Sequence, residues 1–306
     1  MPWLGVLCFL MAGCSPERDP ATLLGADAAG QLVVDAVLLV GQPLPPVYLR
    51  QTRPSGAPYT RAQAAVTEAQ VVLRQGGTVY PYTAHRDSAG CYLPPADAPT
   101  VAPLATYELS VAWADQELTA ATTTPAPVRL TEVVILDAVS LSEVRRLRLV
   151  GAAGDDPWAA PENQLPYRQG LLEARLDDTP ALAFQAAVAN LETDSEFLVD
   201  EGFLEAGDQA DFERQGSSPP TLLPNRRFRL PWFAVAFAGR HVLRIFSIDA
   251  NWYAYIRTAD LGGAFGGLVG DRFDRPRFSV DGGIGLFVSG SVDSVAFVVT
   301  GRAPEP

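Results

Sequence analysis

The stretch Leu32-Val33-Val34-Asp35-Ala36-Val37-Leu38-Leu39-Val40 decides the fold class. It consists almost wholly of aliphatic side chains, many of them β-branched, which are enriched in β-strands. From Gln31 onward the chain continues as short apolar runs separated by turn residues, a pattern typical of all-β proteins. We therefore expect a strong first strand at residues 32–40 and an all-β, mainly antiparallel fold around it.

Further short strands are predicted downstream of this first one. They lie at residues 47–52, 69–74, 79–83, 91–93, 107–113 and 117–124. Gly76-Gly77 marks a hairpin, and Pro81 places the strand at 79–83 at an edge or a bulge. Residues 61–66 fit either one helical turn or a loop. Seven short strands in this space predict an immunoglobulin-like or prealbumin-like β-sandwich over residues 31–125.

A second β-rich domain is expected over residues 126–306, after the linker Thr123-Thr124-Pro125-Ala126-Pro127. Its predicted strands lie at residues 132–138, 144–150, 171–176, 181–188, 226–237, 241–248, 278–280 and 284–299. We expect Gly290 to break the last of them. Asp249-Ala250-Asn251 is a capping sequence for one short helix that runs to about residue 261.

Upstream of the first strand, residues 1–14 are uncharged, almost wholly apolar, and end in Ala12-Gly13-Cys14. Such a segment is typical of a secretory signal, and it is too short for a spanning helix of about 20 residues. The sequence around Cys14 resembles a bacterial lipobox. This resemblance implies a mature protein that begins at Cys14 and is held to a membrane by acyl chains such as palmitate. Residues 15–30 are then a tether, and Ser15 resembles the outer-membrane sorting pattern.

Composition excludes several classes of function. The formal net charge is −12, which disfavours nucleic acid as a partner. All 23 basic residues are Arg, so mechanisms that need a lysine are excluded. Beyond the lipid anchor we expect no direct membrane contact.

No catalytic, cofactor or metal residues are predicted. His85 and His241 are far apart in sequence and lie in no known catalytic motif, so we interpret the first as a loop residue and the second as a strand-end hydrogen-bonding residue. Cys91 is expected to be a small, half-buried strand residue. We therefore expect the protein not to be an enzyme.

Three other stretches have a structural and a functional interpretation. The acidic run 192–213, with Asp208 and Asp211, is a solvated loop rather than a calcium site, because it lacks the spacing of a calcium loop. The glycines of 262–270 and 282–285 serve turns or close packing rather than a nucleotide. Trp252, Tyr253 and Tyr255, with Trp232 and Phe233, are core residues or else a sugar-stacking platform.

Several ordered motifs resemble one known family. They are Leu32-Val33-Val34-Asp35, Ala69-Gln70-Val71, Gly90-Cys91-Tyr92, Tyr107-Glu108-Leu109, Thr122-Thr123-Thr124-Pro125, Tyr253-Ala254-Tyr255 and Asp281-Gly282-Gly283-Ile284-Gly285-Leu286-Phe287. In this order they resemble the Bacteroidetes "domain of unknown function 4249" family, from the lipobox to about Val299. The resemblance implies an outer-membrane lipoprotein, often in the company of TonB-dependent receptors, with no assigned catalytic residues.

Two functions remain open from the sequence. The first is a non-enzymatic binding or accessory lipoprotein of an outer-membrane uptake system, anchored through Cys14 on the periplasmic face or the cell surface. The alternative is a surface hydrolase that acts on glycan or peptide. It would use paired carboxylates about 5–10 Å apart, taken from the acidic run or from the region of Asp281.

Overall fold

The computed structural model describes residues 29–54, 57–149, 156–167, 170–199, 213–231, 234–259 and 276–302. Across these ranges the protein is mostly β-strand, which confirms the all-β fold class. Several predictions fall on residues outside this described part. They are the signal with Cys14, nearly all of the tether, Asp208, Asp211, Trp232, Phe233 and residues 262–270.

The described part of residues 31–125 contains seven strands, as predicted. They are β1 (Leu32–Leu39), β2 (Val47–Gln51), β3 (Gln70–Gln75), β4 (Thr78–Ala84), β5 (Cys91–Leu93), β6 (Thr106–Trp113) and β7 (Gln116–Thr123). The stretch left open between a turn and a loop forms one turn of helix, α2 (Arg61–Ala64). Thr60 caps it, because its Oγ1 accepts a hydrogen bond from the backbone N–H of Gln63.

These strands form two layers around one core. One layer has the order β1-β2-β5, and the other has the order β3-β6-β7. β4 belongs to both layers, since its first residues pair with β3 and its last two pair with β5. β1 shows why the layers face each other: its residues are alternately buried and half-exposed, so that Leu32, Val34, Ala36 and Leu38 all enter the core.

The second half adds further strands and one longer helix. They are β8 (Leu130–Asp137), β9 (Glu143–Leu147), β10 (Gln164–Tyr167), β11 (Gly170–Leu176), β12 (Ala183–Asn190), β13 (Gln215–Ser217), β14 (Arg227–Pro231), β15 (Gly239–Ile248), α3 (Ala250–Ala259), β16 (Val280–Asp281) and β17 (Ile284–Arg302). A short 3-10 turn, Pro161–Asn163, precedes β10. The four-stranded sheet β14-β11-β8-β9 packs against β12, β15 and β17 across a second core.

Two features of the second half differ from the sequence prediction. The strand predicted at 226–237 ends at Pro231, and of the residues after it Phe237 forms only an isolated bridge with Phe197. Val235 enters the main core of this half, and Ala236 and Phe237 pack against Val199. β10 and β13 were not predicted.

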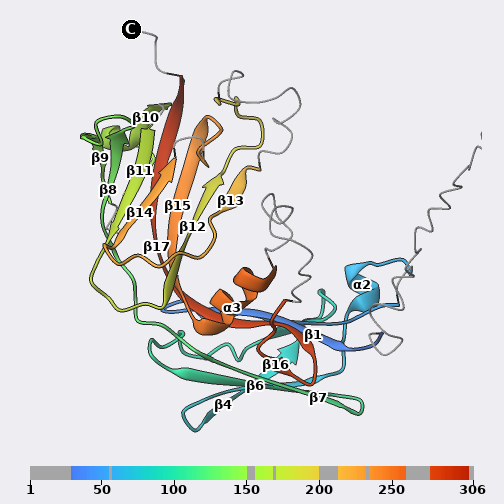
Figure 1. Cartoon of the computed structure of the whole chain (residues 1–306). Helices are drawn as coiled ribbons and strands as arrows, with labels where there is room; N and C mark the ends of the chain where they lie inside the picture. The colour runs from blue at the N-terminus through green and yellow to red at the C-terminus, as the bar shows by residue number, and fades with distance from the viewer. Residues whose placement is uncertain are drawn as a thin grey trace, which may run out of the picture.

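β17 joins the two halves, as its red ribbon shows in Figure 1. Its first residues, 284–290, pair in parallel with β1, and residues 290–299 pair antiparallel with β15. The predicted break at Gly290 is wrong, because the strand continues through this residue. Close packing explains the glycine: an added Cβ would lie 3.1 Å from Cζ3 of Trp252 and 3.0 Å from the carbonyl oxygen of Ser247.

The glycines at 282–285 have the turn and packing role that the sequence predicts. Gly282 has a φ of +76° and turns the chain from β16 into β17. Gly285 has a φ of +121°, and a Cβ there would lie 2.0 Å from the carbonyl oxygen of Val34. β17 contributes Phe287 to the first core and Val295, Phe297 and Val299 to the second. The division into domains at 125/126 stays a prediction.

Candidate functional site

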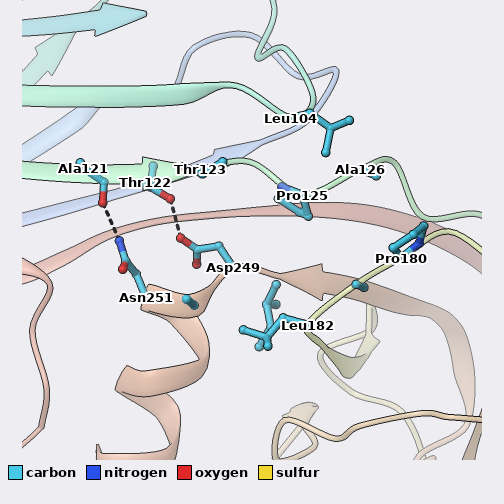
Figure 2. A pocket seen from close by; sticks show the side chains of 13 residues that line it. Leu104, Ala121, Thr122, Thr123, Pro125, Ala126, Pro180, Leu182, Asp249 and Asn251 are labelled. Carbon is cyan, nitrogen blue, oxygen red and sulfur yellow. Dashed lines mark hydrogen bonds between the residues drawn. The ribbon is translucent and has the colours of Figure 1, made fainter.

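A pocket of about 410 Å³ opens where the two halves meet. Leu104, Thr122 and Pro125 line it from the first half, and Pro180, Leu182, Ile248, Asp249 and Asn251 line it from the second. Figure 2 shows Leu104 and Leu182 on two sides of this space, with Pro125 between them. The junction therefore combines an apolar rim with a polar floor.

The floor is organised by Asp249, which caps α3. Its Oδ1 accepts a hydrogen bond from the backbone N–H of Trp252 at 2.9 Å, as a helix cap does. Its Oδ2 accepts a hydrogen bond from Thr122 Oγ1 at 2.5 Å, and that hydroxyl lies 2.7 Å from Ser289 Oγ. The prediction that this segment caps a helix is confirmed, and the cap also ties β7 to α3 and β17.

Asn251 makes a second tie between the halves. Its Nδ2 donates to the carbonyl oxygen of Ala121 at 2.7 Å and to that of Phe287 at 3.2 Å. Figure 2 shows the bond to Ala121 beside the one between Thr122 and Asp249. These contacts tie the N-terminal end of α3 to β7 and β17, so hydrogen bonds from both halves hold the floor of the pocket in place.

Burial raises the pKa of Asp249 above its ordinary value, although hydrogen bonds from Thr122 and from backbone N–H groups act in the opposite direction. Asp249 supplies the carboxylate of the pocket lining. Thr122 is buried and already bonded to two partners, so its hydroxyl is held inside the structure. The arrangement is a structural joint, in which both oxygens of Asp249 and the hydroxyl of Thr122 take part in hydrogen bonds within the protein.

His241 is the strand-end hydrogen-bonding residue that the sequence predicts. It is 1% exposed, its Nδ1 donates to the carbonyl oxygen of Gly239 at 2.9 Å, and its Nε2 accepts from Asn190 Nδ2 at 3.1 Å. This pairing requires the neutral imidazole. Its ring also stacks on Phe297, and burial lowers the pKa of His241 to about 4.

The other sequence candidates lie apart from the pocket lining. Cys91 is buried in β5, somewhat more deeply than the half-buried position expected. His85 lies in the turn before it, where its Nδ1 accepts from the backbone N–H of Asp87. Trp252 packs against Phe246, with ring centroids 5.6 Å apart, and Tyr255 lies 6.0 Å from Phe278. All three α3 aromatics are half-buried, so both interpretations of them remain open.

Glu132, Glu143 and Glu173 lie close to shared arginines on the outer face of the four-stranded sheet. Glu173 is fully buried there, and its oxygens lie 2.8 Å from Arg175 Nε and 2.7 Å from Arg229 Nε. Burial acts to raise the pKa of Glu173, but these hydrogen bonds prevail and lower it. Arg175 and Arg146 also bind Glu132, so this is an ion-pair ladder across the strands.

The acids named for the hydrolase alternative are partly described. Glu192, at the start of the acidic run, pairs with Arg240 at 2.6 Å, and Asp281 belongs to β16, where it pairs with Thr119 of β7. Within the described ranges, no group of three or more His, Cys, Asp or Glu side chains is placed to hold a metal ion. In the same part of the chain, no helix is long and apolar enough to cross a membrane.

The fold and the junction define a two-part β protein whose described halves share β17 and together line the junction pocket. Residues 19–157 match the model of the family described as "Domain of unknown function (DUF4249)". Over those residues the match agrees with the family that the sequence motifs resemble. The motifs at Tyr253-Ala254-Tyr255 and at residues 281–287 lie outside the match, so their resemblance stays a prediction. No curated protein matches the chain.

Proposed function

We propose that the protein is a non-enzymatic binding or accessory lipoprotein of the cell envelope. In this proposal, acyl chains on Cys14 hold it to the outer membrane, and it serves an uptake system with a TonB-dependent receptor. The observation that carries the proposal is the junction pocket. Both halves of the chain line this pocket, and its carboxylate acts in the structure as a helix cap.

Three further features support this proposal. The apolar segment that ends at Cys14 resembles a lipobox. The two cores share β17, which gives a rigid scaffold on which a pocket keeps its shape. The two described histidines are a buried structural residue and a turn residue, so neither lies in the pocket.

Co-purification from native membranes tests the proposal. A tagged chain is extracted in mild detergent beside a Cys14→Ser variant, which differs only at the lipid-attachment residue. We expect a stoichiometric outer-membrane receptor to accompany the tagged chain and to be lost with the variant. Recovery of the tagged chain alone, or the same partners with both chains, would count against an anchored accessory protein.

A further inference from the structure

We propose that the junction pocket binds an uncharged, largely apolar small molecule, held between Leu104 of the first half and Leu182 of the second. This inference deepens the proposed binding function by naming the class of ligand. It rests on the binding role alone and requires no receptor.

Leu104 has an unusual backbone conformation for its residue type. It follows Pro103 in a turn and has a φ of +53°, a region that turns usually fill with Gly or Asn. Left-handed backbone is unfavourable for a residue with a Cβ by about 1–2 kcal/mol. At 74% exposure the side chain adds almost nothing to the core. The leucine at this position therefore has an unfavourable backbone conformation that is not offset by burial of its side chain in the core.

The turn that carries Leu104 is fixed rather than loose. Thr124 Oγ1 accepts from the backbone N–H of Ala105 at 2.9 Å and lies 2.8 Å from the carbonyl oxygen of Ala102. The hydroxyl of Tyr107 accepts from the backbone N–H of Ala102 at 2.8 Å. Both anchoring side chains are buried. Leu104 is therefore presented to the pocket by a rigid frame, the condition under which backbone strain points to a function.

Leu182 contributes the second half's apolar side chain. It is 51% exposed and lies directly before Ala183 and Phe184, which are both buried. Those two residues hold the start of β12 in the sheet beside β15. Pro125 and Pro180 extend the apolar lining beside the two leucines. Two large exposed apolar side chains on one small pocket, each from a different half, form a surface suited to an apolar ligand.

The floor adds little hydrogen-bond selection. Thr122 and Asp249 bond to each other, and the amide nitrogen of Asn251 is used by Ala121 and Phe287. A ligand is thus recognised mainly by apolar contact. The volume of about 410 Å³ lies within the usual range for small-molecule pockets, about 300–1,000 Å³.

Charge selects against ionised ligands. The chain has a formal net charge of −12 and Asp249 lies in the lining, so an anion is repelled. For a cation, Asp249 is the one acid among the described residues of the pocket lining, and each of its oxygens already accepts a hydrogen bond inside the protein, so this lining has no carboxylate set aside for a ligand. The remaining class is an uncharged molecule with an apolar body.

Two probes that share one ring system test this inference on the full chain in detergent. N-phenylnaphthylamine is uncharged, and anilinonaphthalene sulfonate carries a negative charge on a related body. We expect saturable fluorescence enhancement with the uncharged probe, above the background of the same detergent without protein, and a weaker response with the sulfonate. Leu104→Asp and Leu182→Asp should each weaken binding of the uncharged probe by about fivefold or more.

Leu141 is the matched control. It has a φ of +55°, it is 46% exposed, and it lies in the turn between β8 and β9, outside the pocket lining. Leu141→Asp should leave probe binding unchanged. Leu104→Gly and Leu141→Gly both relieve left-handed strain, so both should keep or raise the unfolding temperature. Only Leu104→Gly should lose probe binding, which separates loss of the site from loss of the fold.

Three results would overturn the inference. The first is equal probe binding by Leu104→Gly and Leu141→Gly. The second is equal or tighter binding of the sulfonate. The third is a probe affinity that changes with protein concentration, which would mean that the leucines pair two copies of the chain. The receptor experiment has a different readout. Probe binding without a co-purified receptor would support the ligand pocket and reject the accessory role. A co-purified receptor without probe binding would support the accessory role and reject the ligand pocket.

Discussion

Lowering the pH from 7 to 5 should weaken the fold through His241. Burial lowers the pKa of this residue to about 4, and its ordinary value is about 6.5. Between these values the unfolded chain binds a proton that the folded chain does not. The stability provided by the neutral, buried imidazole is therefore complete above about pH 6.5 and is lost as the pH falls towards 4.

The size of this effect follows from the two pKa values. At pH 5 the unfolded imidazole is almost fully protonated, while the buried one is mostly neutral. The difference corresponds to about 2 kcal/mol of unfolding free energy, since each unit of pKa difference is worth about 1.4 kcal/mol once titration is complete. Such a loss is a large part of the stability of an ordinary domain.

Urea unfolding at pH 7, 6 and 5 measures the effect in wild type, His241→Gln and His85→Gln. Glutamine cannot reproduce both hydrogen bonds of His241, so His241→Gln should be less stable at pH 7. It should, however, lose about 2 kcal/mol less than wild type between pH 7 and 5. His85→Gln is the control for loss of a histidine elsewhere, because it leaves the hydrogen bonds of His241 to Gly239 and Asn190 in place.

The buried acid at the start of α3, Asp249, does not disturb this comparison. The raised pKa of Asp249 acts in the opposite direction, because the folded chain then takes up a proton before the unfolded chain as the pH falls. That contribution is common to all three proteins and cancels in their differences. If wild type and His241→Gln lost the same unfolding free energy between pH 7 and 5, the conclusion that His241 is buried in its neutral form would be refuted.

Three substitutions test other parts of the structure. In denaturant unfolding, Asp249→Ala should lower the free energy of unfolding by about 2 kcal/mol, because a helix cap and a buried hydrogen bond are lost. Asp249→Asn keeps the capping oxygen, so it should lose less than half as much. Glu173→Ala should destabilise by about 3 kcal/mol in the same assay, whereas Glu143→Ala, which removes an exposed member of the same ladder, should leave the midpoint unchanged. Gly285→Ala should sharply reduce the yield of folded protein, because the added Cβ would clash with the backbone of Val34. Gly216→Ala has open space around it and should fold normally. Equal yields of the two variants would contradict the close approach of β17 to β1.

The strands of the first half were predictable because their signal is local. Val71 and Leu73 of β3 are buried, and the residues that alternate with them are not, so period-two patterning alone identifies the strand. β13 lacks this signal, since Gln215–Ser217 contains no apolar side chain. Pro166 weakens the strand signal of β10 in the same way. Both strands form because neighbouring strands offer them hydrogen-bond partners.

The junction was only partly predictable. The capping role of the segment that begins at Asp249 is local and was found, but its bonds to Thr122 and Ser289 join residues far apart in the chain and leave no pattern in either stretch. Parallel pairing of β1 with β17 is invisible for the same reason. For Leu104 the sequence offers only the preceding proline, which favours a turn without requiring left-handed backbone.

The pairing of β1 with β17 also sets the order of assembly. When the first strand leaves the ribosome, one edge of β1 has no neighbour until residues 284–290 have been made. Unpaired strand edges invite association with other chains. The first sandwich is therefore completed only after residues 284–290 have been synthesised. A chain that lacks these residues would leave one edge of β1 unpaired. The first sheet can therefore close only in a chain that has been synthesised at least as far as Gly290.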